Sequence, residues 1–68
     1  MSPSDAKVEI YKAKSLTGVY DALEKAGVNT SRPLLESRKM YNNPQQRELY
    51  WLVNTAIQRI KEIENKEV

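Results

Sequence analysis

The chain has 68 residues, a formal net charge of +2, and neither cysteine nor histidine. Its length allows one small domain, and the missing residue types exclude a disulfide framework, a structural zinc site and a Ser-His-Asp triad. Hydrophobic residues make up 40% of the chain and charged residues 29%, a composition typical of a folded globular protein. We therefore expect a single helical domain over residues 1–68, with residues 1–4 and 65–68 frayed.

The apolar segments are too short for a membrane protein. The longest one, Leu49–Val53, is far from the roughly 20 residues that span a bilayer. The first residues, Met1–Asp5, lack the apolar core of a signal peptide. We therefore expect a cytoplasmic protein that makes no membrane contact.

The first predicted element covers Ser4–Lys14. Ala6, Ile10 and Ala13 share one helical face, but apolar and polar residues also alternate along this segment, as they do in a strand. We favour a helix, because a lone strand would have no neighbour to pair with. The alternative is a small α+β fold with a strand near residues 7–13.

The second predicted helix covers Leu16–Ala26, where apolar residues recur on one face. Gly27 follows the last of them, at the usual place for a left-handed helix stop. Gly18 lies inside this segment. The alternative is one continuous helix over residues 5–26, in which that glycine costs about 1 kcal/mol relative to alanine.

The third predicted helix covers Pro33–Asn42, after a loop over residues 28–31. Proline suits the first position of a helix, because the amide hydrogen that it lacks has no helical partner there. Leu34 and Tyr41 fall on one face of this helix, although the apolar periodicity is weaker than elsewhere.

The fourth segment carries the strongest helical pattern. Asn43 is a good N-cap and Pro44 a good first-turn residue. Apolar residues then recur at spacings of 4, 3, 4 and 3, at Leu49, Val53, Ala56, Ile60 and Ile63. A helix over Pro44–Glu64 is predicted, with fraying after Ile63 because acidic residues near a helix C-terminus oppose its dipole.

Together these segments predict an all-α fold, a small bundle of three to four short helices with a long C-terminal helix. The apolar faces of the helices predict the core. Its expected members are Leu16, Val19, Tyr20, Leu23, Leu34, Leu35, Leu49, Leu52, Val53, Ala56, Ile57 and Ile60.

The stripe on the C-terminal helix has two interpretations. β-branched Val53 and Ile60 occupy positions that suit a two-stranded coiled coil. The stripe covers barely two heptads, however, and Leu52 and Ile57 widen it, as in helices that cover their own core. The first interpretation predicts a homo-oligomer or a groove for a partner, and the second predicts a core.

Trp51 lies on the polar face of the same helix. Tryptophan is enriched at binding hot spots, because it buries a large area while losing few rotamers. The alternative is that the N-terminal helix packs over Trp51. We predict a non-catalytic protein–protein interaction module, a small regulator, inhibitor or assembly subunit, that binds a protein partner or itself through the C-terminal helix. The predicted partner-binding residues are Trp51, Tyr50, Arg47 and Thr55.

A basic stretch offers a second function. Residues 32–47 hold four cations and one acid, Glu36, for a local charge of +3. The alternative function is a small nucleic-acid-binding accessory protein, since cations among amide and aromatic side chains suit phosphate and base contacts. Its contact residues would be Arg32, Arg38, Lys39 and Arg47. The simpler interpretation is a solvated surface.

Catalysis has little support in the sequence. The carboxylates are scattered, without the spacing of a metal site or of a catalytic pair. So short a chain also has difficulty enclosing a cleft in which a pKa can be shifted far. We therefore expect a protein that is not an enzyme and that carries no cofactor and no metal.

Overall fold

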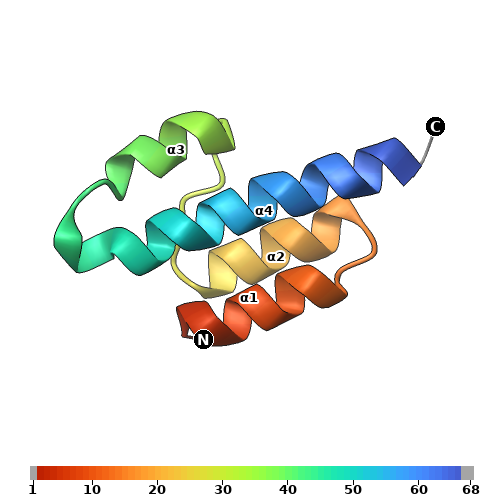
Figure 1. The fold of residues 1–68 in the computed structure, drawn as a ribbon, viewed down its shortest axis with the longest axis horizontal. Coiled ribbons are helices and arrows are strands. Elements are labelled where there is room, and N and C mark those ends of the chain that lie inside the picture. The colour runs from red at the N-terminus through yellow and green to blue at the C-terminus, as the bar shows by residue number, and fades with distance from the viewer. Residues whose placement is uncertain (1, 67–68) are drawn as a thin grey trace.

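The computed structural model describes residues 2–66, which form four α-helices and one short 3-10 helix (Figure 1). The elements in chain order are α1 (Pro3–Lys12), α2 (Leu16–Lys25), α3 (Leu34–Met40), the 3-10 helix η1 (Pro44–Gln46) and α4 (Arg47–Lys66). The all-α prediction is confirmed, and the longest helix is the C-terminal one, as expected. The alternative strand near residues 7–13 is wrong, because residues 7–12 belong to α1.

Local capping explains where α1 and α2 begin. The Ser2 hydroxyl accepts a hydrogen bond from the Asp5 amide at 3.2 Å, and the Ser15 hydroxyl accepts one from the Gly18 amide at 3.3 Å. Each bond satisfies an amide that has no partner within its helix. Ser15 has an extended backbone, so the chain forms two helices and the continuous helix over residues 5–26 is excluded.

Both outer helix ends reach further than we expected. Pro3 and Ser4 belong to α1, and α4 continues past Glu64 to Lys66. The Ser2 cap and a proline at the first position stabilise the start of α1. At the other end, Lys66 puts a favourable positive charge in the last turn, and Ile63 is buried. The rest of the expected fraying, at residue 1 and residues 67–68, falls outside the described residues.

Helix α4 is the central element of the bundle. It contacts α1, α2 and α3, and α1 also contacts α2. In Figure 1, α3 lies along one side of α4, and α1 and α2 lie along the other. Among the described residues, the backbones of α2 and α3 do not approach each other within 8 Å between Cα atoms. The outer helices therefore leave parts of the surface of α4 open between them.

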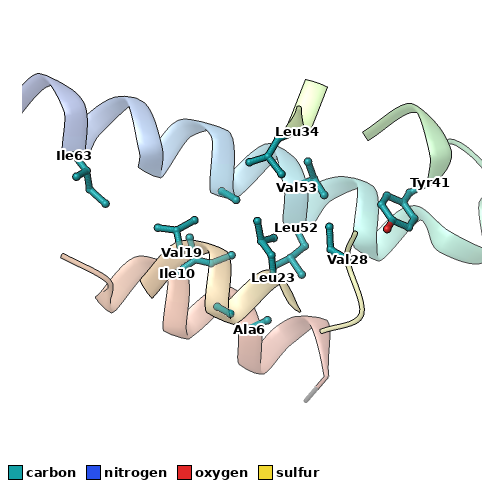
Figure 2. Packing of buried hydrophobic residues seen from close by; sticks show 12 residues of the cluster. Ala6, Ile10, Val19, Leu23, Val28, Leu34, Tyr41, Leu52, Val53 and Ile63 are labelled. Atoms are coloured by element: carbon teal, nitrogen blue, oxygen red, sulfur yellow. The ribbon is translucent and has the colours of Figure 1, made fainter. Parts of the chain in front are cut away.

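The core lies where α1 and α2 meet α4. Figure 2 shows Ile10, Val19 and Leu23 pointing toward the side chains of α4. Most of the apolar stripe faces this core, since Val53, Ala56 and Ile63 are buried and Leu49 and Ile60 are half-buried. Of the two interpretations of the stripe, the structure therefore supports the one in which the helix covers its own core.

The predicted core is right in its centre and wrong at its edge. Six predicted residues are buried, namely Val19, Leu23, Leu34, Leu52, Val53 and Ala56, and four are half-buried, namely Leu16, Leu49, Ile57 and Ile60. The predicted burial of Tyr20 and Leu35 is wrong, because these side chains are 36% and 59% exposed. Both line a hollow between α2, α3 and α4. The buried residues missing from the predicted core are Ala6, Ile10, Ala22, Val28, Tyr41 and Ile63.

The loop between α2 and α3 is fixed by side chains of the third helical segment. The backbone amide of Asn29 donates to the Tyr41 hydroxyl at 3.1 Å, and the buried Ser37 hydroxyl donates to the backbone carbonyl of Asn29 at 3.0 Å. Figure 2 shows Tyr41 beside Val28 at one end of the core. These contacts fix the loop against the third helical segment.

Candidate partner-binding surface

Trp51 is the most prominent side chain on the outer surface of α4. It is 60% exposed, whereas the next residue, Leu52, is 2% exposed and faces the core. Successive residues of a helix point about 100° apart, so Trp51 projects past the edge of the packed face. The alternative in which the N-terminal helix covers Trp51 is therefore wrong. Helix α1 lies beside this tryptophan and leaves most of it exposed.

A groove runs between α1 and α4 next to Trp51. It has a volume of about 480 Å³, and Trp51, Asn54, Thr55 and Gln58 line it from α4. We call it the Trp51 groove. Two smaller hollows also touch this tryptophan, one beside Pro3 at the start of α1 and one beside Tyr50. The Trp51 side chain thus borders three separate hollows.

The opposite wall of the Trp51 groove comes from α1. Tyr11 is 61% exposed and lines the groove together with Lys7. Sequence reasoning missed both residues. A signal was present, because positions four apart lie on the same side of a helix. What the sequence lacked was the side on which α1 would meet α4.

The predicted partner-binding residues surround Trp51 but divide between two hollows. Thr55 lines the Trp51 groove, and its hydroxyl donates to the Trp51 carbonyl at 3.0 Å. Tyr50 and Arg47 line the hollow on the other side. The Tyr50 ring packs edge-to-face with Trp51, with ring centroids 5.5 Å apart and an interplanar angle of 88°. The other three predicted residues therefore each line a hollow that Trp51 also lines, although the four share no single cavity.

Tyr50 is held in place by a cation from α3. The Arg38 guanidinium lies 5.6 Å from the centre of the Tyr50 ring, within the range of cation–π attraction. The Arg38 Nη1 also donates to the Asn54 Oδ1 at 2.8 Å. These contacts join α3 to α4 and fix the Tyr50 ring that packs against Trp51.

The predicted basic residues have different surroundings. The Arg38 guanidinium is engaged with Tyr50 and Asn54, whereas Arg32 and Lys39 are exposed. Arg32 precedes α3, and Arg47 begins α4 after the chain has turned back (Figure 1). Arg32 and Arg47 therefore lie near opposite ends of α3.

The charges around the Trp51 groove are nearly balanced. Arg59 and Glu62 form a salt bridge of 3.1 Å between Nη1 and Oε2, the one salt bridge within residues 2–66. Lys7 adds a positive charge from α1. Two aromatic side chains with amide and hydroxyl neighbours can bury apolar surface and exchange hydrogen bonds with a ligand.

Comparison of the chain with protein families, with curated proteins and with solved structures gives no match. None of the helices in residues 2–66 combines the length and the apolar character needed to cross a bilayer. The same part of the chain holds no cluster of three or more acidic side chains arranged for a metal ion.

Proposed function

We propose that this protein is a non-catalytic protein–protein interaction module, a small regulator, inhibitor or assembly subunit, that binds a protein partner through the surface centred on Trp51. The observation that carries the proposal is the 60% exposure of Trp51 beside an open groove. A tryptophan side chain offers up to about 250 Å² for burial. A partner that covers the exposed part removes about 150 Å² from water, worth about 4 kcal/mol.

The surroundings of Trp51 resemble those of a binding hot spot. Hot spots commonly have an aromatic centre and a rim of polar side chains. Here Tyr50 and Tyr11 flank the indole, while Asn54 and Gln58 supply hydrogen-bonding groups at the groove. Trp51 is not part of the hydrophobic core, so its exposed surface is available to a partner without a change in the core.

Affinity capture with matched variants tests this proposal. The tagged wild type, Trp51→Ala and Met40→Ala are each incubated with native cytoplasmic lysate, since we expect the protein to act in the cytoplasm. One half of the lysate is treated with nuclease and the other half is left untreated. Met40 is the control, because it is a large apolar side chain, 50% exposed, on α3. We expect one stoichiometric protein to be retained by the wild type and by Met40→Ala, and to be lost with Trp51→Ala.

The purified partner then allows a quantitative test. Loss of a hot-spot tryptophan weakens binding by about 2–4 kcal/mol, which raises Kd roughly 30- to 1000-fold. Trp51→Ala should remain folded and lose about 1 kcal/mol of stability, because it removes the edge-to-face contact with Tyr50 while most of the side chain is exposed. A folded Trp51→Ala variant that binds as tightly as the wild type would show that the partner uses another surface.

The nuclease arm separates the two candidate functions. Partners that disappear on nuclease treatment would favour the basic surface of residues 32–47. In that case binding should fall steeply with salt and weaken on charge reversal at Arg38 and Lys39.

A further inference from the structure

A second apolar surface lies between α2, α3 and α4. Tyr20 of α2, Leu35 of α3, and Ile57 and Ile60 of α4 surround a hollow of about 380 Å³. We call these four side chains the Ile60 patch. Tyr20 is 36% exposed and Leu35 59% exposed, while the two isoleucines are half-buried. The patch lies where α2 and α3 both pack on α4 while their Cα atoms, among the described residues, stay more than 8 Å apart.

The Ile60 patch is independent of the Trp51 groove. Ile60 and Trp51 are nine positions apart on α4, which is about two and a half helical turns. Their side chains therefore leave α4 on opposite sides. A ligand on one surface does not cover the other.

The charges at the edge of the patch favour a second copy of this chain as its occupant. Lys61 and Glu64 border the hollow, three positions apart on α4 and opposite in sign. In a dimer with two-fold symmetry, each patch must be complementary to itself. An axis that crosses α4 between these residues brings Lys61 of one copy to Glu64 of the other, and the reverse. The patch is thus self-complementary in charge as well as in apolar character.

The small size of the chain also favours a dimer. A single core in a protein of fewer than about 70–80 residues contributes little stability, and oligomerisation is a common supplement. The chain has no cysteine or histidine with which to build a disulfide or a zinc site. We infer that the protein forms a symmetric homodimer in which the Ile60 patch of one copy covers the Ile60 patch of the other, leaving both Trp51 grooves open.

Analytical ultracentrifugation of variants tests this inference, over protein concentrations from about 10 μM to about 1 mM. Leu35→Asp places a charge within the apolar patch and should weaken the dimer about 100-fold or more. Val8→Asp is the matched control, because Val8 is 48% exposed on α1. This control should dimerise like the wild type. Circular dichroism confirms that each variant remains helical.

Charge reversal tests the two-fold arrangement itself. Lys61→Glu and Glu64→Lys each put like charges opposite one another at two symmetric positions, so each should weaken the dimer about tenfold. The double variant Lys61→Glu with Glu64→Lys restores opposite charges and should return Kd to within about threefold of the wild type.

Three results would overturn the inference. The first is a wild-type protein that is monomeric at the highest concentration, and the second is a dimer that Leu35→Asp leaves unchanged. The third is a dimer on which the single charge reversals have no effect, or which the double reversal fails to restore. Trp51→Ala should dimerise normally. Loss of the dimer in Trp51→Ala would place the interface on the Trp51 groove, and would also show the inference to be wrong.

Discussion

Arg59 joins the end of α1 to α4 and provides the sharpest test of the packing. Its Nε and Nη2 donate to the Ala13 carbonyl at 3.1 and 2.6 Å, and its Nη1 bonds to Glu62. Ala13 is the C-cap of α1, where carbonyls lack helical partners and carry a partial negative charge. The Arg59 side chain is only 15% exposed, so water replaces these bonds poorly if the guanidinium is removed.

The expected effect of Arg59→Met follows from these contacts. Methionine keeps the apolar stem and removes the donors. Hydrogen bonds to a charged group contribute about 1.5–3 kcal/mol, so we expect the free energy of unfolding to fall by about 2–3 kcal/mol. Glu62 is 62% exposed, and Glu62→Gln should therefore cost about 0.5 kcal/mol or less. Arg59→Lys should fall between them, because lysine cannot reproduce the two-pronged contact.

Urea unfolding followed by far-UV circular dichroism measures these differences. A domain of this size commonly has only about 3–5 kcal/mol of stability, so the curves should be recorded with a stabilising osmolyte such as trimethylamine N-oxide. All variants need one protein concentration, because dimerisation raises apparent stability. If Arg59→Met is as stable as the wild type, or if Glu62→Gln costs as much as Arg59→Met, the carbonyl contact does not stabilise the bundle as argued.

Two further substitutions test the loop between α2 and α3. Ser37→Ala removes the donor to the Asn29 carbonyl from a fully buried position and should cost about 1–2 kcal/mol in urea unfolding; an unchanged midpoint would contradict the role given to this bond. Gly27 has a φ of 92°, a backbone conformation that residues with a side chain rarely adopt. Gly27→Ala should therefore lower the unfolding free energy by about 1–2 kcal/mol. Thermal unfolding checks this second value, and a rise in Tm would show that Gly27 does not need its left-handed conformation.

The features that the sequence predicted well are those set by neighbouring residues. Asn43 caps the short helix before α4 through bonds to the amides of Gln45 and Gln46, as its place before Pro44 indicates. The period of the apolar stripe located α4 and placed Trp51 on its polar face, but whether α1 would cover that tryptophan was left open until the structure showed it 60% exposed. Capping and helical periodicity act within a few residues, so they can be read along the chain.

The features that escaped prediction depend on residues far apart in the sequence. Tyr20 and Leu35 have the periodicity of core residues, but their burial requires the backbones of α2 and α3 to approach closely, and these do not come within 8 Å between Cα atoms. Tyr11 faces a groove only because α1 packs beside Trp51. Arg59 bonds to a carbonyl 46 positions away. The pattern of one helix says nothing about which neighbour will cover each of its edges.

Both proposed surfaces thus depend on how the outer helices are fixed to α4. Arg59 holds the end of α1, and so helps to set the far wall of the Trp51 groove, whereas Arg38 and Asn54 fix α3 and the position of Leu35. Weakening the attachment of α1 and weakening that of α3 should have different consequences. In Arg59→Met, a shift of α1 should weaken binding at the Trp51 groove while the Ile60 patch still dimerises, because α1 contributes no residue to that patch. A parallel loss of both activities would mean that the bundle opens as one unit, as expected if α1 is needed for the cooperative fold.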